Sequence, residues 1–275
     1  MRVYLGDGQG VWKDASAGID NDSTIHDVTA ADFTGDGLAD IAGLCMFPDD
    51  GQGIYCFKNS GFGTWARMHE EPLLGEEVFG VDIMNDDIDD DGDIDLLATT
   101  SKGLKVFMND GAGQFSDVSS GLPRPRVGGT LTALDVGDLT GNGRKEIVLG
   151  AYNTNTQPAL EVYERIIEKD DIGHEWRRLF VGPYPKDFTF GLALGDMDQD
   201  GDLDLVTTSV TDELNEAVTV YENDGTGVLS EKGHITGTSG RSFLKLADFN
   251  NDGRLDVLTV FSNRGGGVEV NIQKL

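Results

Sequence analysis

Residues 87–95 read DIDDDGDID, which places six carboxylates in nine consecutive positions. Carboxylates this close repel one another and raise each other's pKa, so the run indicates either a disordered solvated segment or a cation site. The pattern recurs at 55, 51, 58 and 52 residue intervals as DFTGDGLAD (32–40), DIDDDGDID (87–95), DLTGNGRKE (138–146), DMDQDGDLD (196–204) and DFNNDGRLD (248–256). This regularity predicts a repeated structural unit of a little over fifty residues.

The surroundings of the five nonamers also repeat. An apolar run precedes each copy and a second follows it, and a third run leads through a glycine-rich turn to an aromatic or apolar position. That position is expected to open a fourth strand and to pack between sheets; it is occupied by Trp12, Trp65, Phe115, Trp176 and Leu229. Four short antiparallel strands repeated at this interval are typical of a β-propeller blade.

We therefore predict an all-β fold, a β-propeller of about five four-stranded antiparallel blades in a single domain, 1–275. The blade units are expected near 21–75, 76–125, 126–184, 185–237 and 238–275, with 1–20 completing the last one. Pairing of the N- and C-terminal strands would close the ring and hide two sheet edges that otherwise invite aggregation. This leaves one of 21 expected strands surplus, so five blades cut from a longer ring remain an alternative.

Each nonamer offers oxygen donors at alternate positions. Position 6 is always glycine, which permits the positive φ of a tight loop, and position 7 is expected to contribute its backbone carbonyl. The expected ligands at positions 1, 3, 5, 7 and 9 are Asp32, Thr34, Asp36, Leu38 and Asp40; Asp87, Asp89, Asp91, Asp93 and Asp95; Asp138, Thr140, Asn142, Arg144 and Glu146; Asp196, Asp198, Asp200, Asp202 and Asp204; and Asp248, Asn250, Asp252, Arg254 and Asp256. Oxygen-only donors favour hard cations, and several carboxylates on a flexible loop suit Ca²⁺. We expect up to five calcium ions.

The alternative interpretation of these loops is a set of solvated Asp-Gly hairpin turns. A turn needs one or two such residues, whereas four oxygen-bearing positions recur here in five copies, which favours metal binding. The copy at 138–146 is the weakest, because it contains Arg144 and Lys145. An EF-hand is excluded, because position 12 holds no acid in any copy.

The charge balance points away from nucleic acids. A formal net charge of −28 repels phosphates and anionic lipid surfaces. No apolar run approaches the 18 residues of a membrane span, and the segment after Met1 lacks the pattern of a signal peptide. Because millimolar extracellular calcium would saturate even weak loops, we expect a secreted or extracellular protein whose signal peptide lies outside this sequence.

The nonamer followed by an apolar strand, together with turns such as NDGAGQF (109–115), resembles the FG-GAP or VCBS repeat family of β-propellers. That family includes integrin α-chain propellers and a fungal lectin that binds N-acetylglucosamine. The resemblance covers essentially the whole chain and implies calcium in the hairpin between the first two strands of each blade. It does not identify a ligand, because propellers carry their functions on variable loops.

No catalytic motif is apparent. The four histidines form no HExxH pattern, and neither GxSxG nor CxxC occurs. We therefore expect an extracellular binding module, for carbohydrate recognition or adhesion, with glycans or extracellular proteins as partners. A polysaccharide hydrolase or lyase and a purely structural, self-assembling propeller remain alternatives. Tyr184 and Phe188, in an insertion that breaks the repeat, are weak ligand candidates.

The two cysteines flank a predicted hairpin. If Phe47 lies opposite Ile54, Cys45 falls opposite Cys56, close enough for a cross-strand disulfide. The sequence leaves a disulfide and two buried thiols equally open.

Overall fold

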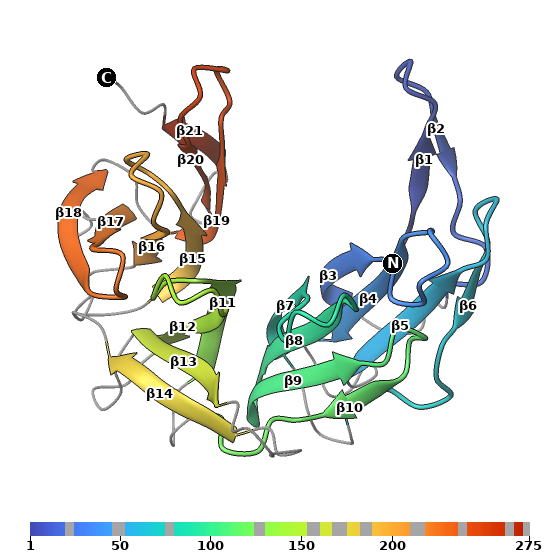
Figure 1. Cartoon of the computed structure of the whole chain (residues 1–275). Helices are drawn as coiled ribbons and strands as arrows, with labels where there is room; N and C mark the ends of the chain where they lie inside the picture. Colours follow the sequence, from blue (N-terminus) through green and yellow to red (C-terminus); the bar gives the residue numbers. More distant parts are fainter. Residues whose placement is uncertain are drawn as a thin grey trace. The chain divides into compact units, whose positions relative to one another are not determined.

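The computed structural model describes residues 1–19, 25–45, 53–74, 80–123, 130–152, 160–166, 175–181, 189–209, 218–235, 241–261 and 267–271. Its regular elements in these ranges are 21 β-strands (Figure 1). None of the described segments forms a helix of the length and apolar character needed to cross a membrane. The chain divides into two compact units, Met1–Ser119 and Ser120–Leu275.

The first unit contains three antiparallel sheets, each with its strands in chain order. A two-stranded sheet joins β1 (Tyr4–Gly6) and β2 (Trp12–Asp14). The second sheet comprises β3 (Ile25–Ala31), β4 (Asp40–Cys45), β5 (Ile54–Asn59) and β6 (Trp65–Arg67). The third comprises β7 (Gly80–Asp86), β8 (Asp95–Thr100), β9 (Gly103–Asn109) and β10 (Phe115–Asp117).

The second unit repeats the four-stranded design twice and then adds three strands. Its first sheet comprises β11 (Thr130–Gly137), β12 (Glu146–Tyr152), β13 (Leu160–Ile166) and β14 (Glu175–Val181). Its second comprises β15 (Thr189–Gly195), β16 (Asp204–Ser209), β17 (Val218–Asn223) and β18 (Leu229–Ile235). The last comprises β19 (Arg241–Ala247), β20 (Asp256–Phe261) and β21 (Gly267–Asn271).

The predicted all-β architecture with four-stranded antiparallel sheets is confirmed. The blade count, the single domain and closure of a ring by the terminal strands stay predictions. One packing prediction is wrong, because Trp12 is 69% exposed, whereas Trp65, Trp176 and Leu229 are buried. Trp12 lies in the two-stranded sheet, which lacks the inner strands that cover the same position in the four-stranded sheets.

Neighbouring sheets inside each unit meet through their first strands. β3 lies beside β7 in the first unit, and β15 lies beside both β11 and β19 in the second. A carboxylate joins two of these pairs: Asp27 Oδ2 accepts the N–H of Ile83 at 2.9 Å, and Asp135 Oδ2 accepts that of Leu194 at 2.8 Å. Each of the five first strands also shifts register near its start, as a β-bulge does.

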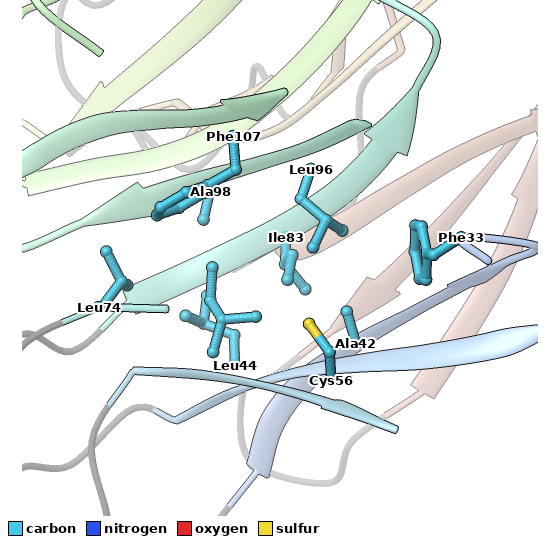
Figure 2. Close-up of a cluster of buried hydrophobic side chains, with 10 residues drawn as sticks. Phe33, Ala42, Leu44, Cys56, Leu74, Ile83, Leu96, Ala98 and Phe107 are labelled. Carbon is cyan, nitrogen blue, oxygen red and sulfur yellow. The ribbon is translucent and has the colours of Figure 1, made fainter. Parts of the chain in front are cut away.

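Apolar side chains fill the space between the sheets. In the first unit, β4 and β5 face β7, β8 and β9 through a buried cluster that Figure 2 shows gathered between the ribbons. Phe33 belongs to this cluster although it lies in the acidic loop at 32–40, and its ring meets Phe115 edge to face at 5.7 Å. The loop is therefore anchored in the core by its second residue.

Both cysteines are buried thiols, not a disulfide. The register that the sequence suggested is wrong, because Cys56 lies opposite Ala42 and the N–H of Cys45 bonds to the carbonyl of Gly53. The strands therefore turn earlier than expected, and Cys45 lies three pairs along the ladder from Cys56. Burial raises the pKa of the Cys56 thiol to about 12.

Candidate metal sites

Each of the five nonamers connects the first and second strands of a sheet, as predicted for a propeller hairpin. We number them loop 1 (32–40, between β3 and β4), loop 2 (87–95, between β7 and β8), loop 3 (138–146, between β11 and β12), loop 4 (196–204, between β15 and β16) and loop 5 (248–256, between β19 and β20). The final acid of each loop is the first residue of the following strand.

The loop backbone curls through two left-handed positions. The glycine at position 6 has φ between 79° and 100° in all five loops, as the sequence predicted. Position 4 is also left-handed, with φ between 58° and 67°, and the sequence analysis missed it. Its occupants are Gly35, Asp90, Gly141, Gln199 and Asn251. Glycine, aspartate and asparagine tolerate this conformation best, and their recurrence was the available signal.

The acid at position 1 holds the turn closed. In loop 2 the Asp87 carboxylate accepts the N–H of Asp91 at 3.1 Å and that of Gly92 at 3.0 Å. Position 5 then accepts the N–H of position 7, as in Asp93 to Asp91 at 2.9 Å. These bonds shape the loop from its own side chains and backbone.

The acid at position 9 is buried in every loop. In loop 4, Asp204 accepts the N–H of Met197 at 2.8 Å and that of Asn223 at 2.9 Å, and Asp95 is bonded in the same way in loop 2. Burial raises the pKa of Asp95 to about 7 and raises that of Asp204 as well. A buried carboxylate of this kind is stabilised in its charged form by a nearby cation.

Three carboxylates converge in loops 2 and 4. Oxygens of Asp87, Asp89 and Asp95 lie within 4.8 Å of one another, and so do oxygens of Asp196, Asp198 and Asp204. Positions 1, 3 and 9 therefore meet in these two loops, and their role as metal ligands stays a prediction. The carboxylates at position 5 are outside these clusters, and each accepts the N–H of position 7 in its own loop. The carbonyls at position 7 stay predicted ligands.

One oxygen in loop 4 has the surroundings of a cation ligand. Asp196 Oδ1 is buried and accepts no hydrogen bond from the described residues. In the other four loops the equivalent Oδ1 of the position 1 acid accepts the N–H of position 5 at 3.1 Å. In loop 4 the N–H of position 5, Asp200, donates to Asp198 Oδ1 instead, at 3.2 Å. A buried carboxylate oxygen without a hydrogen bond is costly unless a cation satisfies it.

The remaining three loops have threonine or asparagine at position 3, so three carboxylates cannot meet at positions 1, 3 and 9. In loop 3, Thr140 Oγ1 bonds to Glu146 Oε1 at 3.2 Å. In loop 5, Asn250 Nδ2 donates to Asp252 Oδ2 at 2.8 Å. These ligands stay predictions.

Loop 1 contains a cation of its own. Lys58, on β5, places Nζ 2.8 Å from Asp36 Oδ2 and 3.1 Å from Thr34 Oγ1. The hydrogen bond to Asp36, and the charges of Asp36, Asp40 and Asp32, raise the pKa of Lys58. The sequence analysis missed this residue, because it lies 18 residues beyond the loop on a different strand.

Two asparagines brace the loops from the third strand. Asn223 Nδ2 donates to the carbonyls of Leu139 at 2.8 Å and Leu203 at 3.0 Å, and so joins loops 3 and 4. Asn109 Nδ2 bonds in the same way to Phe33 and Ile94 and joins loops 1 and 2. The repeated NDGxG turn was the signal for these residues, although the sequence analysis used it only for the fold. Tyr184 and Phe188, the weak ligand candidates, lie outside the described residues.

Comparison with known families gives a match for four of the five loops. Residues 87–149 and 196–259 match the family described as FG-GAP-like repeat, and each match spans two of the five loops. Comparison with the curated proteins gives no match.

Several solved structures are similar to this chain. One is a lectin from Agrocybe aegerita, described as specifically recognising non-reducing terminal N-acetylglucosamine. It has a TM-score of 0.60 and 19% identity over 98% of this chain and 73% of the lectin. A GH43 β-1,3-galactosidase with galactodeoxynojirimycin has a TM-score of 0.47 and 10% identity over 85% of this chain and 87% of that one. The C-terminal domain of PilY1 from Pseudomonas aeruginosa has a TM-score of 0.47 and 12% identity over 97% and 67% of the two chains.

The predicted resemblance is thus confirmed: residues 87–149 and 196–259 are FG-GAP-like repeats, within a chain that shares the fold of a lectin β-propeller.

Proposed function

We propose that this protein is a calcium-binding β-propeller that acts outside the cell as a binding module, with carbohydrate as its ligand class. Calcium binding is supported above all by the buried Asp196 Oδ1, which lies among the converging carboxylates of loop 4 and accepts no hydrogen bond from the described residues. Loop 2 has the same three acids at the same positions. Both loops offer oxygen donors only, the ligand set that hard cations prefer.

The charge of the chain supports the same proposal. The five nonamers contain 19 of its 49 acidic residues, and five divalent ions would reduce the net charge from −28 to −18. Bound calcium, which the family resemblance implies for these loops, would supply positive charge where carboxylates face one another. Hydrogen bonds to the side chains at positions 1 and 5 shape the turn, and the acid at position 9 bonds it to the third strand.

An extracellular location belongs to this proposal because millimolar calcium outside cells would saturate even loops of low affinity. Ring closure through the terminal strands belongs to the same proposal, because their pairing would cover two sheet edges that otherwise invite aggregation.

Carbohydrate is the ligand class to test first, because the chain shares its fold with a lectin described as recognising terminal N-acetylglucosamine. A glycan array probed with the full chain in millimolar calcium tests this. We expect reproducible binding to defined sugars. An array without binding, for protein that is calcium-loaded and folded, would overturn the carbohydrate assignment but leave calcium binding intact. Hydrolysis of an arrayed polysaccharide would instead indicate an enzyme.

A further inference from the structure

Lys58 stands out in a comparison of the third strands. The pairs Ile41–Phe57, Leu96–Phe107, Ile147–Tyr163 and Leu205–Tyr221 occupy the same place in the four-stranded sheets. The next residue on the third strand is therefore equivalent in all four; these residues are Lys58, Met108, Glu164 and Glu222. Lys58 is the one base among them.

The acidic residues at this place are neutralised from the fourth strand. Glu164 forms an ion pair with Arg177, and Glu222 forms one with Lys232. Lys58 is paired differently, because its partners are the position 5 and position 3 side chains of loop 1, Asp36 at 2.8 Å and Thr34 at 3.1 Å. Its ammonium therefore lies among the oxygens that the sequence assigns to a metal.

We propose that the Lys58 ammonium is the resident cation of loop 1, and that this loop is a cation site that binds no calcium. The inference rests on the proposed calcium binding of the other loops. An ammonium 2.8 Å from Asp36 Oδ2 would repel a Ca²⁺ that approached the same carboxylate to the 2.3–2.6 Å distance of its oxygen ligands, so the two cations compete for it. Lys58 is thus a specificity-determining residue, which excludes the divalent ion from one loop.

Loop 1 keeps three carboxylates, Asp32, Asp36 and Asp40, so it lacks no charge for a metal site. In the neighbouring sheet, Met108 occupies the equivalent place beside loop 2, where three carboxylates converge with no lysine from that position. Two differences therefore separate the loops: the lysine beside loop 1, and Thr34 at position 3 of loop 1 where loop 2 has Asp89.

The test counts calcium ions in the whole chain by equilibrium dialysis, in wild type, Lys58→Met and Lys105→Met. Lys58→Met copies the residue beside loop 2 and should bind one more ion than wild type. Lys105→Met is the matched control, because Lys105 pairs with Asp117 away from the loops, at 2.6 Å, and its loss should leave the count unchanged. Equal counts in wild type and Lys58→Met would overturn the role of Lys58, whereas a wild-type chain that binds no calcium would overturn the proposed function itself.

A second measurement needs no variant. Labelling of lysines with an amine-reactive ester, read by peptide mass spectrometry, should modify Lys58 equally in excess calcium and in EDTA. If calcium enters loop 1 it displaces the ammonium, and labelling of Lys58 at least several-fold faster in calcium would contradict the inference.

Discussion

The acid at position 9 should stabilise the protein even without metal, and Asp204→Ala tests this. Asp204 is 1% exposed and accepts two backbone N–H groups, from Met197 at 2.8 Å and Asn223 at 2.9 Å. A hydrogen bond to a charged group contributes about 1.5–3 kcal/mol, so removing two should lower the free energy of unfolding by about 3–6 kcal/mol. For a unit of this size that lowers the melting temperature by at least roughly 6 °C.

The assay is thermal unfolding of the full chain in EDTA and in millimolar calcium, with Asp198→Asn as the matched variant. Asp198 is exposed, and asparagine keeps an oxygen to accept the N–H of Asp200. In EDTA it should therefore melt within roughly 2 °C of wild type, a shift of about 0.5 kcal/mol. Both variants should bind calcium more weakly, because each loses a carboxylate of loop 4. If Asp204→Ala has the same melting temperature as wild type in EDTA, position 9 has no structural role and the reasoning fails.

Three further outcomes are expected. Asn223→Ala should lower the free energy of unfolding by about 2–4 kcal/mol, because two carbonyls and the N–H of Gly227 lose their hydrogen-bond partner. Thr226→Ala in the same turn is the control, and equal urea midpoints for the two variants would refute the bracing role of Asn223. Gly18→Ala should prevent native packing of the N-terminal segment, because a Cβ would lie 1.9 Å from the Trp65 carbonyl oxygen. Its control, Gly8→Ala, has open space around it and should lower the free energy of unfolding by only about 1 kcal/mol for its positive φ, so similar melting temperatures of the two variants would contradict this reasoning. In EDTA, burial raises the pKa of Asp95 to about 7, above its unfolded value near 4, so the stability that its protonated form contributes is present below about pH 4 and lost as the pH rises through 7. The melting temperature should therefore decline more steeply with pH for wild type than for Asp95→Asn, and parallel declines would argue against the raised pKa.

The repeat predicted most of the fold. Recurrence of the nonamer and of the strands around it indicated the sheets, because each hairpin has to satisfy the same local rules of turn chemistry and apolar patterning. Trp12 and the cysteine pair were placed wrongly for related reasons. Trp12 is exposed because its described sheet has two strands, whereas three equivalent positions are buried in four-stranded sheets. The Cys45–Cys56 register depends on where the chain turns, which the Gly-rich segment left open.

The parts of the candidate metal sites that could be predicted are those whose contacts lie within one loop. Positions 1, 5 and 6 of each loop follow from turn geometry, and the positive φ of Gly92 could be expected from its place in the pattern. Lys58 and Asn109 could not be assigned in the same way, because they reach the loops across strand pairs and across sheets. Sequence spacing gives no account of such contacts until the register is known.

The most direct test of calcium binding is the anomalous diffraction signal from crystals of this chain grown in millimolar calcium. We expect ions at the centres of Asp87, Asp89 and Asp95 and of Asp196, Asp198 and Asp204, with coordination distances of about 2.3–2.6 Å. Ordered water at both centres, with the carboxylates turned outward, would contradict the proposal that these loops are calcium sites.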